Sequence, residues 1–283
     1  MTICVAIKVH DCLVFAADSA TSLVGSDDQG HPTIFNVMAH GNKVFNLVKG
    51  LPICAMTCGM GNIGRASIST LAKDLRKRLG SNVDQGGVDR DNYSIQDIAS
   101  RARTFFYEEK YLGLPELPNG HHSLEFFIGG YSTGSEQAEV WKIIVANGNC
   151  PEPVCQLSPD ASATVLWSGQ PEALNRLLLG YSQHLPDALL AAGLDPDKLD
   201  PAMRQIQTHT STPLAEDPMP TGDAIALADF LVHTTKMYVH FLRGADTVGG
   251  DTDIATVTKY EGFKWIKRKH YYPRELNVET DHV

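Results

Sequence analysis

Short apolar runs of strand length stand in blocks on either side of helical segments, and this order restricts the folds open to the chain. The alternation and β-branched content of these runs predict strands, and a 3.6-residue apolar period predicts helices. Strands are predicted at 2–9, 13–17, 43–48, 52–58, 124–130, 138–146, 164–168, 254–258 and 263–266, and helices at 62–79, 94–111, 171–181 and 223–242. Because strands and helices do not alternate one by one, a doubly wound parallel sheet is excluded. We predict an α+β chain with helices layered on antiparallel sheets.

The connecting segments differ in character. Residues 22–42 and 148–159 are polar and contain glycine or proline, so we expect loops there. Ser94 with Asp97 predicts a capped helix start. Helix 223–242 is apolar around most of its circumference and is expected to be buried. With no internal repeat and no linker, residues 1–283 are predicted to form a single domain.

Charge and composition exclude several classes of function. The 283 residues carry 24 Lys+Arg against 33 Asp+Glu, a net charge of −9, which argues against nucleic acid as the main partner. No run approaches the roughly 18 apolar residues of a membrane span, and the N-terminal run is too short for a signal peptide. We therefore expect a cytoplasmic protein without a membrane partner. Six cysteines in a chain of this length are too few for a disulfide scaffold.

Three motifs suggest other chemistry but lack the context that each needs. Residues 59–64 match GxGxxG, yet the helix after them leads into a loop and not into a second parallel strand. Residues 130–134 match GxSxG, yet a strand follows where a nucleophile elbow requires a helix, so a hairpin turn is predicted. The pairs Cys54/Cys58 and Cys150/Cys155 do not have CxxC spacing, which disfavours zinc.

The N-terminus offers a fourth chemistry. Thr2 follows Met1 and leads directly into a predicted strand. If Met1 is removed, Thr2 gains a free α-amine, a group whose ordinary pKa is about 7.7–8.0 and which can act as base near neutral pH. A threonine hydroxyl is a weak nucleophile unless a base stands beside it, and an N-terminal threonine carries its own base. Thr2 is therefore a candidate nucleophile.

An ordered set of short motifs around Thr2 resembles the proteasome β-type subunits, which are N-terminal nucleophile (Ntn) hydrolases. The motifs are 2–8 (TICVAIK), 13–21 (LVFAADSAT), 42–47 (NKVFNL), 55–61 (AMTCGMG), 127–131 (FIGGY), 166–169 (LWSG), 248–250 (VGG) and 254–258 (IATVT). They cover the chain from residue 2 to about 266 in the family's order. The absence of a pro-peptide makes the chain most similar to the bacterial branches, namely the ATPase-dependent ring protease and the Anbu proteins. Relative to compact members, residues 181–220 are an insertion.

The resemblance implies a role for particular residues. Thr2 corresponds to the nucleophile and general base, Asp18 to the carboxylate that holds the lysine, and Lys43 to the cation beside the nucleophile. Gly59 corresponds to the glycine whose N–H forms the oxyanion hole.

Other positions complete the expected site. Ser168 matches a serine near the terminal amine. Asp246 is nearest to the family's late Asp-x-x-Ser pair, with a one-residue shift, and Asp251 is the alternative. Thr21 and Gly61 are expected to border the substrate pocket.

The family's fold and activity follow as expectations. The resemblance implies a four-layer αββα sandwich and a threonine peptidase that needs neither metal nor cofactor. Its substrates would be peptides or unfolded proteins, its assembly a homo-oligomeric ring, and an AAA+ ATPase unfoldase a candidate partner. Two alternatives stay open, a small-molecule amidase on the same fold and a non-catalytic ring subunit.

Overall fold

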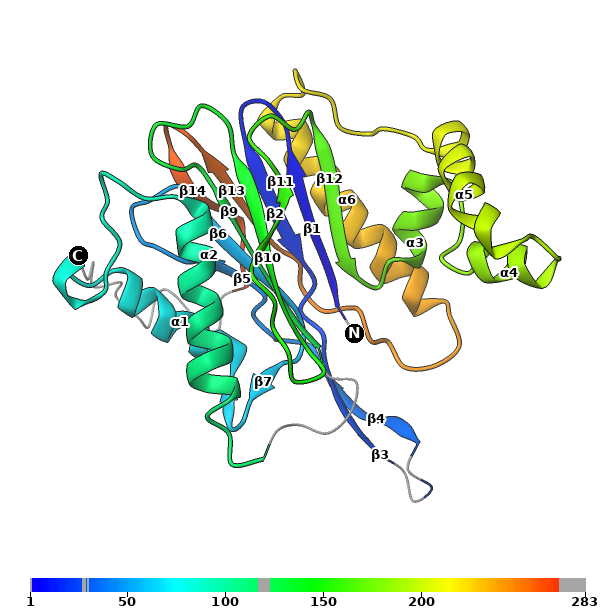
Figure 1. The fold of residues 1–283 in the computed structure, drawn as a ribbon, viewed down its shortest axis with the longest axis horizontal. Helices are drawn as coiled ribbons and strands as arrows, with labels where there is room; N and C mark the ends of the chain where they lie inside the picture. Colours follow the sequence, from blue (N-terminus) through cyan, green and yellow to red (C-terminus); the bar gives the residue numbers. More distant parts are fainter. Residues whose placement is uncertain (1, 27–28, 30, 117–122, 270–283) are drawn as a thin grey trace.

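Two five-stranded antiparallel sheets stack face to face in the computed structural model, which describes residues 2–26, 29, 31–116 and 123–269 (Figure 1). The first sheet has the order β12 (Thr164–Gly169), β1 (Ile3–Lys8), β2 (Leu13–Ala17), β13 (Asp253–Thr258) and β14 (Gly262–Lys267). The second has the order β11 (Val154–Leu157), β10 (Glu139–Ala146), β9 (Ser123–Gly130), β6 (Ile53–Gly59) and β5 (Val44–Asn46). Their facing sides form an apolar layer that includes Phe15 of β2 and Met56 of β6, both fully buried.

Helices cover both outer faces, so the predicted αββα sandwich is confirmed (Figure 1). On the second sheet lie α1 (Ile68–Leu79) and α2 (Ile95–Arg103), which continues as the π-helical η2 (Thr104–Tyr111). On the first sheet lie α6 (Thr221–His240), α3 (Glu172–Leu174) and η3 (Asn175–Leu179). Two further helices, α4 (Leu185–Ala191) and α5 (Pro196–Thr210), lie beyond α3 within the expected insertion.

Local sequence explains where the main helices begin. The Ser94 side chain accepts a hydrogen bond from the Asp97 amide, which confirms the predicted cap of α2. Helix α1 starts at residue 68, six residues later than predicted, because Ser67 caps it by accepting from the Thr70 amide. The residues before it form a small hairpin of β7 (Asn62–Ile63) and β8 (Ala66–Ser67).

Two segments expected to be loops contain strands. The structure forms a hairpin of β3 (Thr21–Ser26) and β4 (Pro32–Met38) in one of them and β11 in the other. The hairpin projects from the body of the molecule (Figure 1), and its Phe35 side chain is 66% exposed. A strand whose apolar side chains face solvent lacks the half-buried pattern by which strands are recognised in a sequence.

Helix α6 is less buried than its apolar sequence predicts. It buries only one face, which includes Ala228, Leu231 and Val232, whereas Phe230 and Met237 are exposed. Apolar residues around a helix therefore do not establish burial on every side. None of the helices in the described residues is long and apolar enough to span a membrane.

The structure also shows the context of the two glycine motifs. Residues 59–64 run from the end of β6 through β7, and α1 is followed by the short 3-10 helix η1 (Val83–Gln85) and not by the parallel strand that a GxGxxG dinucleotide site requires. In the GxSxG segment, the Ser132 hydroxyl donates to Glu139 and accepts from the Ile95 amide at 2.9 Å. The segment connects the antiparallel pair β9 and β10, so the predicted hairpin connection is confirmed.

Candidate active site

A pocket of about 1380 Å³ lies beside the start of β1, between the β3–β4 hairpin and the N-terminal end of α1. Five of the predicted site residues line it, and they come from separate parts of the chain: Thr2, Thr21, Lys43, Gly59 and Gly61. Thr21 fits tightly between two glycines, because a Cβ at Gly41 would lie 2.2 Å from its Oγ1 and one at Gly61 would lie 3.3 Å from its Cγ2. The topology thus gathers these positions around one cavity.

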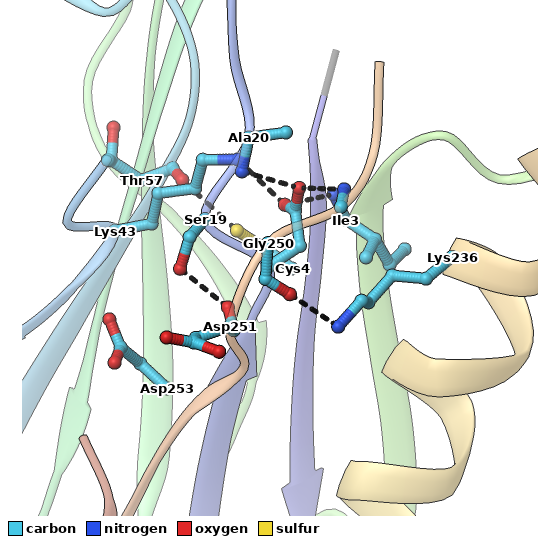
Figure 2. A network of polar contacts seen from close by, with 12 residues as sticks. Ile3, Cys4, Ser19, Ala20, Lys43, Thr57, Lys236, Gly250, Asp251 and Asp253 are labelled. Atoms are coloured by element: carbon cyan, nitrogen blue, oxygen red, sulfur yellow. Dashed lines mark hydrogen bonds and ion pairs between the residues drawn. The ribbon is translucent and has the colours of Figure 1, made fainter. Parts of the chain in front are cut away.

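Asp18 and Lys43 form a buried ion pair next to the pocket. Lys43 Nζ donates to Asp18 Oδ1 at 2.7 Å, and the side chains are 7% and 0% exposed. The Ile3 amide donates to the same oxygen at 3.0 Å, while the amides of Ala20 and Gly249 donate to Oδ2 at 3.0 Å (Figure 2). The four donors satisfy both carboxylate oxygens, and these hydrogen bonds offset the free-energy cost of burying the charge.

The same contacts fix the N-terminal strand. The Ile3 amide that Asp18 binds belongs to the peptide unit that starts at Thr2, so the carboxylate lies one residue from the candidate nucleophile. Directly after the neighbouring strand β12, the Gln170 amide donates to the Thr2 carbonyl at 2.8 Å. A Cβ at Gly169 would lie only 1.9 Å from that carbonyl oxygen, which explains a glycine there.

Gly59 has a left-handed backbone at the end of β6. Its φ is +92°, and a Cβ would lie 2.0 Å from the Ser123 carbonyl oxygen. Both the angle and the contact require glycine, independently of any role in an oxyanion hole.

We expect Gly59→Ala to lower the free energy of unfolding by more than about 1 kcal/mol, since alanine is strained at positive φ and also clashes. Gly134→Ala is the matched control, because Gly134 has φ +76° with no atom within 4 Å of a built Cβ. Denaturant midpoints of the two variants separate the clash from the strain. Equal midpoints would contradict the tight contact at Gly59.

Ser168 lies on β12 directly opposite Cys4 of β1. Its hydroxyl forms a hydrogen bond with Glu125, a residue that the sequence analysis did not single out. Ser168 Oγ donates to Glu125 Oε2 at 2.7 Å, and Lys142 Nζ approaches the same oxygen at 3.4 Å. Glu125 belongs to β9 of the other sheet, so this contact links the two sheets near the pocket. The available signal was a single charged residue in an otherwise apolar predicted strand.

The structure does not bring Asp246 to this cluster. Its side chain is 54% exposed and pairs with His240 at the end of α6 at 2.9 Å. The turn at 249–251, a few residues after Asp246, reaches Asp18 through its backbone. The Gly249 amide donates to Asp18, and the Asp251 carbonyl accepts from Ser19 Oγ.

The buried thiols near the site are poor nucleophiles. Burial, aided by the Glu125 carboxylate, raises the pKa of Cys58 to about 11, although a hydrogen bond with Ser168 and the Lys43 charge oppose the rise. Burial also raises the pKa of Cys4 well above its ordinary value. A thiol with a pKa three units above the solution pH is about one-thousandth thiolate.

We therefore expect iodoacetamide at pH 8 to modify Cys155, the one exposed cysteine, in the native protein. Cys4, Cys12, Cys54, Cys58 and Cys150 are buried and should react only after unfolding. Peptide mass spectrometry checks this order. Rapid native modification of Cys58 would contradict its burial.

No group of three or more His, Cys, Asp or Glu side chains within 2–26, 29, 31–116 and 123–269 is placed to hold a metal ion. The two cysteine pairs considered for zinc are not brought together: Cys54 and Cys58 lie on β6 in the layer between the sheets, Cys150 packs in the core under α2, and Cys155 is exposed.

Comparison with known proteins returns a structural similarity. No protein-family model matches the chain, and no curated protein matches it. Among solved structures, the chain is similar to the Anbu (Gly-1) mutant from Hyphomicrobium sp. strain MC1, with a TM-score of 0.46 and 16% identity over 98% of this chain and 91% of that chain. Anbu is one of the bacterial groups that the sequence motifs resemble.

Proposed function

We propose that this chain is a threonine peptidase that hydrolyses peptide bonds with Thr2 as N-terminal nucleophile. The observation that carries the proposal is the buried Lys43–Asp18 pair: Lys43 lines the same cavity as Thr2, and Asp18 accepts from the amide of the Thr2–Ile3 peptide unit. A buried ion pair is costly to desolvate and is weak evidence for stability alone. The position of Lys43 at a pocket that Thr2 also lines supports a catalytic role.

In the proposed reaction, the peptide bond before Thr2 is first cleaved to free the α-amine. Thr2 Oγ attacks the substrate carbonyl carbon while its proton passes to that amine, which later protonates the leaving amine. The resulting acyl-enzyme ester is hydrolysed by water, which restores the hydroxyl. Lys43 supplies a positive charge near the developing negative charge, and the Gly59 amide is the proposed oxyanion donor, a type of contact worth about 2.7–4 kcal/mol.

Two observations favour this function over the alternatives. A cavity of about 1380 Å³ exceeds what a small amide needs, which supports a peptide substrate over a small-molecule amidase. The buried Lys43–Asp18 pair, which binds the amide of Ile3 and has its lysine at the pocket that Thr2 lines, supports a catalytic subunit over a non-catalytic one.

Assembly and location are part of the proposal. We infer a cytoplasmic homo-oligomeric ring, with an AAA+ ATPase as a candidate unfolding partner for protein substrates. Exposed apolar side chains on the β3–β4 hairpin and on α6, among them Phe35 and Phe230, support burial against other subunits. Light scattering after size exclusion should give a mass several times 30.9 kDa, and a monomer at micromolar concentration would count against the ring.

The direct test of the activity uses a threonine-directed electrophile, such as a peptide epoxyketone, on the purified protein. We expect labelling at residue 2, identified by peptide mass spectrometry, together with loss of fluorogenic peptide hydrolysis. Hydrolysis that survives complete labelling, or labelling at another residue, would overturn the assignment of Thr2.

A further inference from the structure

A second buried lysine–aspartate pair lies on the other side of Ser19 from the Lys43–Asp18 pair. Lys269 follows β14 and Asp253 begins β13, and both side chains are 3% exposed. Lys269 Nζ contacts Asp253 Oδ2, and the Lys269 amide donates to Asp253 Oδ1 at 3.1 Å. Because desolvating two charges can cost more than their attraction returns, the pair calls for a role beyond stability.

The third contact of Lys269 points to that role. Its Nζ also donates to Ser19 Oγ at 2.6 Å, and Ser19 Oγ donates in turn to the Asp251 carbonyl at 2.5 Å. Ser19 is fully buried and directly follows Asp18. Figure 2 shows Ser19, Asp251 and Asp253 together below the Lys43 side chain.

The turn at 249–251 carries these contacts to Asp18. The Gly249 carbonyl accepts from the Ser19 and Ala20 amides, both at 2.9 Å, and the Gly249 amide donates to Asp18 Oδ2 at 3.0 Å. The turn packs closely against the backbone of Ala39, since a Cβ at Gly250 would lie 2.4 Å from the Ala39 carbonyl oxygen. From the helix side, Lys236 Nζ donates to the Gly250 carbonyl at 2.5 Å (Figure 2). Hydrogen bonds of Ser19 and of the backbone at 249–251 thus link Lys269 to Asp18.

We propose that Lys269 is a positioning residue, which acts through Ser19 to hold the turn at 249–251 against the Asp18 carboxylate. Asp253 fixes the ammonium group so that one of its protons is directed at Ser19 Oγ. The turn then keeps the Gly249 amide on Asp18, and Asp18 keeps Lys43 in place. The catalytic consequence rests on the proposed function, whereas the structural part can be measured without it.

The experiment compares three variants of the full-length protein. Lys269→Met alone leaves Asp253 as an unpaired buried charge, so Lys269→Met/Asp253→Leu, which removes both charges, is the main variant. Lys269→Arg keeps a cation that can bind both partners. Lys267→Met is the matched control, because Lys267 lies in the same segment, and its side chain is 54% exposed and forms an ion pair with the exposed Asp229 at 3.5 Å.

Hydrogen exchange measures the structural part. In the charge-free double variant we expect the Ser19, Ala20 and Gly249 amides to exchange at least tenfold faster, while the Lys269→Arg and Lys267→Met variants keep wild-type rates. Unchanged exchange of these three amides in a folded double variant would overturn the proposal, whatever the enzyme activity.

Kinetics measure the catalytic part. We expect the double variant to lose at least tenfold in kcat with KM within twofold, because Asp18 and Lys43 serve the reaction and not the binding of the peptide. Ser19→Ala added to the double variant should cost less activity than Ser19→Ala alone costs in the wild-type protein, since the Lys269–Ser19 contact is already lost and only the Ser19–Asp251 contact is left to break. A fully additive loss, or a change in KM alone, would contradict action through Ser19. Failure of the wild-type protein to label at Thr2 would instead overturn the proposed function and leave the exchange result to decide the role of Lys269.

Discussion

Lys43→Met is expected to reduce peptide hydrolysis by at least about 100-fold, the scale of loss for one electrostatic group in an active site. The Lys43 ammonium contacts Asp18 at 2.7 Å and borders the pocket that contains Thr2, and methionine fills a similar volume without charge. The variant should also lose about 3 kcal/mol of unfolding free energy, because the fully buried Asp18 loses its counter-ion. Denaturant unfolding and steady-state kinetics measure the two effects separately.

The expected loss of stability follows from the tertiary structure. Lys43 stands at the start of a predicted strand, and for a cation at such a position the sequence alone would predict a small cost of truncation. The structure buries Lys43 against Asp18, so a larger cost is expected. Lys73→Met is the control, since Lys73 also borders the pocket but is exposed and on α1. Equal losses of activity in both variants would show a general effect of positive charge and would contradict the specific role of Lys43.

Thr2→Ala is expected to abolish hydrolysis, with a loss of about 10⁴-fold or more, as for removal of a covalent nucleophile. Stability should change by no more than about 1 kcal/mol, because only a hydroxyl and a methyl group are removed from a buried position. Thr2→Ser keeps a hydroxyl beside the amine and should retain measurable activity. Intact mass and kcat, measured on the same preparations, check these results.

The state of the N-terminus provides the control. A peptide-bonded nitrogen has no basic lone pair, so molecules that retain Met1 should be inert, and an uncleavable N-terminal extension should inactivate the protein without unfolding it. A tag after Val283 should leave activity intact. Full activity in a preparation whose mass includes Met1 would exclude Thr2 as an N-terminal nucleophile and would favour the non-catalytic subunit. Met1 itself lies outside the described residues.

Periodicity and capping residues were sufficient to predict most elements of the sandwich. The runs that became β1, β2, β6, β9 and β13 are apolar and short, and Ser94 marks the start of α2. These features depend on local chain geometry, in which side-chain period and cap chemistry determine secondary structure. The order of strands and helices then excluded a parallel sheet without any knowledge of the pairing.

The sequence alone determined the order of strands and helices along the chain, the start of α2 that Ser94 marks, and a small set of residues around which a site could be built. Only the tertiary structure decided which residues meet: Asp18 and Lys43 across 25 positions, Ser168 and the overlooked Glu125 across 43, and Lys269 with Ser19 across 250. It also separated Asp246 from the pocket and paired β3 with β4 as a hairpin with exposed apolar side chains. Such contacts arise from strand register and from the stacking of two sheets, and a local pattern of apolar and polar residues carries no record of either.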